Sequence, residues 1–289
     1  MPDDPLALLG ELTKPAIVLI EKISDAVGGI FRPYQMLRVA KAEAAVEELR
    51  VESAIHITDL HRRAMRRFLE EEAKKQANIE EITARALPLL SENSRPRDVN
   101  DDWITNFFDK SRIVSDSDMQ ELWARILAGE ANSPGNFSRG TVNLLADLGK
   151  SDAQLFSTLC SFRWNRGSQP ALPLIYDPMA EIYKKNGLFF AGLSHLEALT
   201  LIHLDPHSGF ILQNQPKDVT LGYFGKDITL TLPTEPDNIL DVGMVFPTRA
   251  GIELATVCRA QPVEGFADYI IEKWRSMGLA PKKSGAGWP

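Results

Sequence analysis

Cysteine is scarce in this chain of 289 residues, which contains only Cys160 and Cys258. Neither belongs to a CxxC pair, so the sequence lacks the spacing of a zinc ribbon or a thioredoxin-like redox site. Both lie in apolar, helical contexts, where a free cysteine is usually buried. We therefore expect two buried, reduced thiols in a cytoplasmic protein.

Long hydrophobic runs are also missing. The longest apolar run near the N-terminus covers residues 16–20, whereas a spanning helix needs about 20 apolar residues. The first residues, Met-Pro-Asp-Asp, are acidic where a cleavable signal would be basic. These absences predict a cytoplasmic protein whose only membrane contact would be peripheral.

Motifs that carry chemistry are absent too. There is no P-loop, no GxGxxG after a strand, no HExxH and no GxSxG. His56 and His61 have the wrong spacing to share a metal on one helix face. Ser194, His195 and Cys160 have no base that the sequence brings to them. We expect no enzyme activity, no cofactor and no metal.

What is present is an ordinary globular composition. Hydrophobic residues make up 44% and charged residues 25% of a chain long enough for one large or two modest domains. The formal net charge of −7 argues against a general nucleic-acid binder, although a local basic patch could still act.

Residues 15–27 have the pattern of an amphipathic helix that begins at a proline and ends before Gly28-Gly29. One interpretation is an element that lies on a membrane or against another subunit. The other is an ordinary core or interface helix, favoured by the lack of a lysine- and arginine-rich polar face. The candidate contact residues are Ile17, Leu19, Ile20, Ile23, Val27, Ile30 and Phe31.

Neither glycine nor proline occurs from Tyr34 to Leu87, and good helix formers dominate there. The apolar spacing is not a strict heptad, so a simple two-stranded coiled coil is not indicated. We expect a stalk or oligomer-forming arm. The alternative is a helical hairpin within one domain.

The one dense basic cluster lies on this long helix and comprises Arg62, Arg63, Arg66 and Arg67. Such a cluster could bind phosphates or an acidic partner. The alternative is a solvated face, because Glu70, Glu71 and Glu72 follow at a spacing that allows pairing within the helix.

Residues 115–160 carry the most regular pattern in the chain, and one further helix precedes them. A helix over residues 101–108 would bury Trp103, Phe107 and Phe108. Three further helices follow, with apolar residues at helical spacing and predicted starts at Asp116 or Ser117, at Ser138 and at a Ser151–Gln154 capping box.

After residue 174 the pattern changes to helices and short strands. Strands are predicted over 210–213, 219–224, 228–232 and 243–247, with helices over 179–185, 193–202, 248–258 and 266–274. This order resembles a winged-helix module, which binds DNA or proteins. Residues 174–276 hold 8 Lys/Arg against 13 Asp/Glu, which favours a protein-contact or structural role.

Four phrases, at residues 14–29, 70–80, 101–110 and 122–132, resemble an uncharacterised bacterial family, domain of unknown function number twenty-eight hundred and six. The most specific is Trp123-Ala-Arg-Ile-Leu-Ala-Gly-Glu130. After the turn that follows this phrase, the family continues Ser-Lys-Arg-Thr, whereas this chain has Ser138-Arg-Gly-Thr141. Gly140 should slightly weaken the start of the helix predicted at Ser138. More weakly, the helix layout is similar to the abortive-infection alpha proteins, which implies a role in phage defence and no catalytic residues.

Together these patterns predict a mainly α protein with a small α+β part: a long helical arm and helical bundle followed by a winged-helix-like C-terminal module. The predicted segments are 1–31, 32–165, 166–276 and a disordered tail at 277–289. The predicted function is non-enzymatic: a homo-oligomer acting in antiphage defence or stress response by contact with a protein partner or a membrane. The alternative is a nucleic-acid-binding regulator that uses the winged module and the Arg62–Arg67 cluster.

Overall fold

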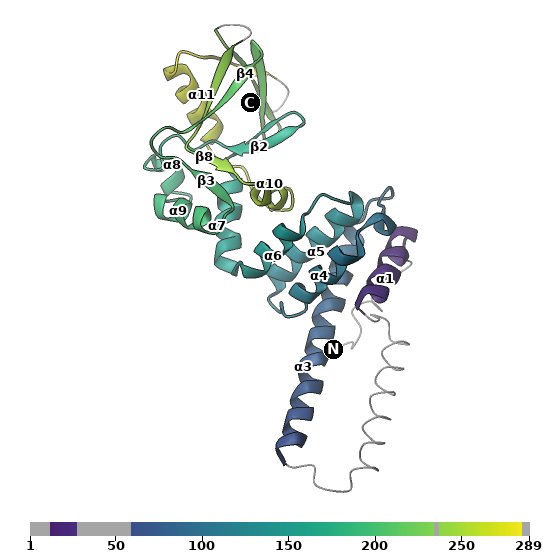
Figure 1. The fold of residues 1–289 in the computed structure, drawn as a ribbon. Coiled ribbons are helices and arrows are strands. Elements are labelled where there is room, and N and C mark those ends of the chain that lie inside the picture. Colours follow the sequence, from purple (N-terminus) through teal and green to yellow (C-terminus); the bar gives the residue numbers. More distant parts are fainter. Residues whose placement is uncertain (1–11, 28–58, 234–236, 285–289) are drawn as a thin grey trace. The chain divides into compact units, whose positions relative to one another are not determined.

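The computed structural model describes residues 12–27, 59–233 and 237–284, which form two compact units divided between Ala146 and Asp147 (Figure 1). Predictions that concern Ile30, Phe31 and residues 34–58 lie outside the described residues. The described part is a mixed α/β structure with several antiparallel sheets. The mainly helical N-terminal part and the α+β C-terminal part are confirmed at this level.

The first unit is helical. Its elements are α1 (Lys14–Val27), α3 (Asp59–Ala86), the short 3-10 turns η2 (Leu87–Leu89) and η3 (Pro96–Asp98), α4 (Asp101–Ser111), α5 (Ser117–Asn132) and α6 (Arg139–Asp147). The aromatic residues predicted to be buried form its centre, because Phe107 contacts Trp103, Phe108 and Trp123 at ring-centroid distances of 5.0 Å. Such ring contacts stabilise the core in addition to the stabilisation that comes from burying the apolar area of the rings.

Short polar side chains begin these helices. Asn100 accepts a hydrogen bond from the Trp103 backbone N–H and caps α4. Asp116 accepts from the N–H groups of Asp118 and Met119 at 3.0 and 3.1 Å, and Ser138 accepts from that of Thr141 at 3.2 Å. Each bond satisfies an N–H that has no partner within its helix. The starts predicted at Asp116 and Ser138 are confirmed.

The family-resembling phrase in α5 builds the turn that follows this helix. The two carboxyl oxygens of Glu130 accept hydrogen bonds from the backbone N–H groups of Gly135 (2.7 Å) and Phe137 (2.9 Å). The Phe137 ring lies against Gly129, where an added Cβ would be 2.7 Å from the ring carbon Cε2. Trp103 Nε1 donates to the Phe137 carbonyl at 2.7 Å. The phrase is therefore structural.

The second unit begins with α7 (Lys150–Cys160) and continues through α8 (Glu181–Lys184), α9 (Phe190–Ala198), α10 (Arg249–Ala255) and α11 (Phe266–Ser276). The predicted Ser151–Gln154 capping box is wrong. The N-cap is Gly149, two residues before Ser151, and the Asp152 carboxylate accepts the Gly149 N–H at 2.9 Å.

Its strands form three antiparallel groups. One sheet has the order β2 (Gln169–Pro173), β1 (Arg163–Arg166), β5 (Asp218–Tyr223), β6 (Lys226–Thr231), β9 (Ala280–Ser284). Two-stranded ribbons pair β3 (Ile202–Leu204) with β8 (Val245–Pro247) and β4 (Phe210–Gln215) with β7 (Asn238–Gly243). The strands predicted at 210–213, 219–224 and 228–232 correspond to β4, β5 and β6, and the one at 243–247 overlaps β8. β7 and β3 were not predicted, and the helix predicted over 193–202 ends at Ala198.

Two further segments differ from their prediction. Residues 163–173, which span the boundary predicted between residues 165 and 166, form the β1–β2 hairpin, in which Trp164 and Leu172 pair and are buried. Residues 280–284, expected to be disordered, form β9 on β6. Both segments add strands to what was expected to be a small wing, and the structure does not show a winged helix.

The core of the second unit is aromatic. Trp164 stacks on Tyr223 at 5.1 Å and meets Trp274 edge-to-face at 5.2 Å, and Phe266 contacts Phe162 at 4.9 Å. α11 thus covers the sheet with Phe266 and Trp274, which are both 0% exposed. None of the described helices is both long and apolar enough to cross a bilayer.

Candidate interaction surface on helix α3

Helix α3 is buried along only part of its length. Of its 28 residues, the buried ones lie between Asn78 and Ala86, where the helix packs on α5. Residues 59–71 are all exposed. Among them, Leu60, Met65, Phe68 and Leu69 have exposed fractions of 65%, 44%, 57% and 53%. We call these four residues the α3 stripe.

The α3 stripe continues the buried face of its own helix. With about 100° of rotation per residue, Phe68 lies in line with Ile79, Ile82 and Ala86. Leu60 lies to one side of this line, and Met65 and Leu69 lie to the other. Ile79, Ile82 and Ala86 are 7%, 0% and 0% exposed because α5 covers them. One apolar face therefore runs along α3, covered at its C-terminal end and exposed at its N-terminal end among the described residues.

The buried end of α3 is held by a polar network. Asn78 Nδ2 donates to the Arg112 carbonyl at 2.8 Å, and Gln120 Nε2 donates to Asn78 Oδ1 and to the Val114 carbonyl at 3.2 and 2.9 Å. These bonds tie α3 to α5 and to the segment between α4 and α5. They fix the direction in which the exposed half of α3 projects.

Within the Arg62–Arg67 cluster, Arg63 and Arg66 lie on the side of α3 opposite to Phe68. Arg62 and Arg67 flank the stripe, next to Leu69 and Leu60 respectively. Arg62 pairs with Asp59 at 3.2 Å, Arg66 with Glu70 at 2.9 Å and Arg67 with Glu71 at 3.4 Å. Arg63 has no ion-pair partner within the described ranges. Since such exposed pairs contribute only about 0.3–0.5 kcal/mol each, they give the solvated-face interpretation physical support and leave the four side chains accessible.

The N-terminal candidate residues are placed differently. Leu19, Ile20 and Ile23 of α1 are 0%, 4% and 0% exposed and pack toward η3 and α4. Lys22 Nζ holds the helix in place by pairing with Asp101 at 2.9 Å and donating to the Arg97 carbonyl. In this fold the apolar face of α1 is part of the unit's core, while Ile17 is exposed and Val27 half-buried.

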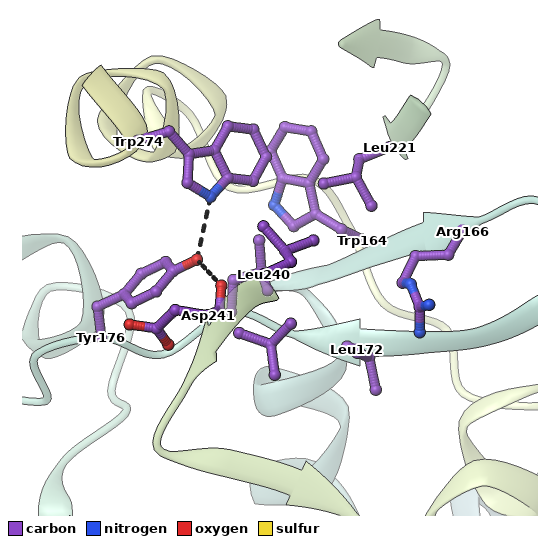
Figure 2. Close-up of a pocket in the computed structure, with 10 residues that line it drawn as sticks. Trp164, Arg166, Leu172, Tyr176, Leu221, Leu240, Asp241 and Trp274 are labelled. Carbon is purple, nitrogen blue, oxygen red and sulfur yellow. Dashed lines mark hydrogen bonds between the residues drawn. The ribbon is translucent and has the colours of Figure 1, made fainter. Parts of the chain in front are cut away.

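The cavities of the described residues hold no comparable site. A cleft of about 440 Å³ between α1 and α4 is lined by charges of both signs, including Glu21, Lys22 and Arg97. A void of about 10 Å³ in the second unit has room for one water molecule (Figure 2). In the described ranges, no three His, Cys, Asp or Glu side chains gather as a metal site.

Polar groups beside this void are largely satisfied. Tyr176 accepts a hydrogen bond from Trp274 Nε1 at 3.0 Å and donates to the Asp241 carbonyl at 2.9 Å (Figure 2). Burial raises the pKa of Tyr176, so the phenol is neutral and acts as a structural donor. Two other lining donors, Trp164 Nε1 and Arg166 Nε, have no hydrogen-bond partner. At about 10 Å³ the void is too small for a ligand larger than one water molecule.

A histidine–aspartate pair joins α7 to α9 in the second unit. His195 Nε2 lies 2.8 Å from Asp152 Oδ1, and Asp152 also accepts the Gly149 N–H. The hydrogen bond to His195, then that to Gly149, lowers the pKa of Asp152. Its carboxylate therefore stabilises the folded state above its unfolded pKa of about 3.9, and this contribution disappears as pH falls through the lower folded pKa.

We expect this pair to shape the acid sensitivity of the second unit. Asp152→Asn should reduce the steepness with which the free energy of unfolding decreases below about pH 4. Denaturant titrations at a series of pH values would measure this. Identical pH slopes for the variant and the parent chain would contradict the assignment.

The fold and surface together define a mixed α/β protein with a helical unit, an antiparallel-sheet unit and an exposed apolar stripe on a long helix. Residues 62–271 match the family described as a protein of unknown function, DUF2806. The chain belongs to this family, which confirms the resemblance seen in the sequence. Comparisons with curated proteins and with solved structures gave no match, so the weaker similarity to abortive-infection alpha proteins stays a prediction.

The sequence predicted that α3 belongs to an arm, which stays a prediction, but it did not identify the α3 stripe as a site. Its candidate residues were the four arginines, because charge clusters are visible in a sequence and exposure is not. The only available signal was the continuity of the apolar spacing from Leu60 to Ala86. That signal cannot tell which part of the face a neighbouring helix covers.

Proposed function

We propose that this protein acts without catalysis and assembles with copies of itself through the α3 stripe. The observation that carries the proposal is the continuation of the covered face of α3 into an uncovered stretch with large apolar side chains. Contiguous apolar surface of this kind marks interaction sites on soluble proteins. A second copy of α3 offers a matching surface, as in the self-complementary interfaces of symmetric dimers.

Energetics favour such an assembly. Fully burying one Leu, Met or Phe side chain contributes about 1.5–3 kcal/mol, and a symmetric contact buries the stripes of both copies. Association costs on the order of 4–15 kcal/mol in lost freedom of motion. The stripe is therefore sufficient for a weak to moderate association, which other contacts would strengthen.

The alternative is a nucleic-acid-binding regulator. It would use the Arg62–Arg67 cluster together with a winged-helix arrangement of residues 166–276. The accessible arginines support this alternative. However, the acidic partners of Arg62, Arg66 and Arg67 within the helix partly neutralise their charge and so weaken their electrostatic attraction to phosphates. We therefore favour assembly.

Replacing the α3 stripe by glutamine should dissociate the assembly. Glutamine keeps high helix propensity while removing the apolar surface of Leu60, Met65, Phe68 and Leu69. Size-exclusion chromatography with light scattering at micromolar concentration should give a mass above the 32.2 kDa of one chain for the parent protein. The four-fold variant should give the mass of one chain.

A matched control lies on the same helix turns. Changing Arg63 and Arg66 to glutamine alters the side of α3 opposite to Phe68 and should leave the mass unchanged. A parent protein that is monomeric at micromolar concentration would refute the assembly. Dissociation caused only by the arginine changes would instead assign the contact to the basic side, and salt-sensitive retention of DNA or RNA would favour the alternative.

The cellular role follows from the resemblance and not from the geometry. We propose a contribution to antiphage defence or stress response in which the assembled form contacts a protein partner or a membrane surface. Because Leu19, Ile20 and Ile23 are buried, any membrane contact by α1 would require this helix to leave its unit. We therefore place partner contact on the exposed half of α3.

A further inference from the structure

The two cysteines of the chain are brought together by the fold of the second unit. Cys160 is the last residue of α7, and Cys258 follows the end of α10. Arg163, close after Cys160, donates a hydrogen bond to the carbonyl of Ala255, the last residue of α10. A small cavity of about 20 Å³ is lined by Cys160, Gly251 and Ala255 together. The chain segments that carry the thiols are therefore neighbours.

The thiols themselves are in contact. The hydrogen bond between Cys160 and Cys258, followed by burial, raises the pKa of the Cys160 thiol. A hydrogen bond raises the pKa of a thiol when that thiol is the donor. Cys160 thus donates its S–H to the sulfur of Cys258, which places the two sulfurs next to each other.

The environments of the two sulfurs differ in a way that suits stepwise oxidation. Cys160 is 4% exposed, whereas Cys258 is half-buried. The more accessible of two thiols meets an oxidant first, and its buried neighbour can then resolve the product. Cys258 also lies between Ala255 and Phe266, a stretch without helix or strand, so its backbone can adjust to the short S–S bond.

We propose that Cys160 and Cys258 form a reversible intramolecular disulfide, with a hydroperoxide as the oxidant. The Cys258 thiolate attacks one peroxide oxygen, which gives a sulfenic acid on Cys258 and releases the other oxygen as hydroxide or alcohol. The Cys160 sulfur then attacks the sulfenic sulfur, and water leaves as the S–S bond forms. A dithiol restores both thiols by exchange.

The bond would link the C-terminus of α7 to the segment after α10. Because these positions lie far apart in the sequence, the closed loop is long, and such crosslinks restrict the unfolded chain strongly. Oxidation is expected to raise the melting temperature of the second unit. This modification is independent of assembly through the α3 stripe.

The experiment uses the full chain treated with hydrogen peroxide and then unfolded in the presence of an alkylating reagent. Before oxidation both cysteines should be alkylated. After oxidation neither should react, the intact mass should fall by two hydrogen atoms, and a peptide containing Cys160 linked to Cys258 should be found. Treatment with dithiothreitol should return both alkylation sites.

Two variants separate this pathway from other oxidations. Cys160→Ser should stop the reaction at a sulfenic acid on Cys258 that dimedone traps, whereas Cys258→Ser should leave Cys160 unoxidised at the same peroxide dose. Two alkylated cysteines after treatment of the parent chain, or crosslinks only between chains, would overturn the proposal. Light scattering distinguishes this result from the assembly test, because a failed disulfide leaves the assembled mass unchanged.

Discussion

Replacing Gly243 by alanine should destabilise the second unit by about 4 kcal/mol. Gly243 ends β7 with φ at +86°, a region that side-chain-bearing residues rarely adopt. An added Cβ would lie 2.3 Å from the carbonyl oxygen of Ile175 and 2.7 Å from its carbonyl carbon. These are backbone atoms, so the clash cannot be relieved by rotating a side chain.

The surrounding hydrogen bonds prevent an easy shift. Met244 N–H donates to the same Ile175 oxygen at 2.8 Å, and Gly243 N–H donates to Asp241 Oδ1 at 2.7 Å. Gly243 also pairs with Phe210 across the β4–β7 ribbon. Moving Gly243 away from Ile175 would therefore break the bridge that joins this ribbon to the segment after β2.

Gly225→Ala is the matched control for this substitution. Gly225 has φ at +84° in the β5–β6 turn, and no heavy atom lies within 4 Å of the position of its added Cβ. Only the backbone cost of about 1 kcal/mol applies there. Urea unfolding of both variants measures the difference in their free energies of unfolding. Equal stabilities would show that the contact with Ile175 does not cause the loss of stability in Gly243→Ala.

The helices of the first unit could be predicted because their signals are local. Trp103, Phe107 and Phe108 recur at helical spacing, and Asp116 and Ser138 stand directly before apolar stripes. Period and cap depend only on neighbouring residues. The family phrase was also recognised from local sequence, although its role in holding the Phe137 turn through Glu130 required the structure.

The sheet of the second unit could not be predicted in the same way. Trp164 and Leu172 lie in strands of only 4 and 5 residues among polar neighbours, where alternation is hardly measurable. β9 owes its existence to pairing with β6, a contact between distant parts of the chain. Without these strands the remaining pattern resembled a wing, which explains the winged-helix prediction.

The candidate surfaces show the same limit. Leu19, Ile20 and Ile23 of α1 and the α3 stripe are both apolar faces of amphipathic helices, and their sequence patterns are alike. In the structure the first is covered by its unit and the second is exposed. Burial depends on the tertiary neighbours, so periodicity alone could not rank the two faces as interaction sites.

Replacing Glu130 by alanine should destabilise the first unit by about 3 kcal/mol. Glu130 is 3% exposed, and its two carboxyl oxygens serve the N–H groups of Gly135 and Phe137. Alanine would leave both donors without their acceptor, at about 1–3 kcal/mol for each donor that remains buried. The turn also places the Phe137 carbonyl for Trp103 Nε1, so its loss would loosen the aromatic core.

Two comparisons make this prediction specific. Glu130→Gln retains one oxygen acceptor but turns an NH₂ group toward the other N–H, so its loss of stability should be intermediate. Glu121→Ala, on the same helix, removes an ion pair with Arg125 at 3.2 Å and should cost about 0.5 kcal/mol. Denaturant unfolding of the three variants measures the order. If Glu130→Ala were no more destabilising than Glu121→Ala, Glu130 would have to serve something other than the turn.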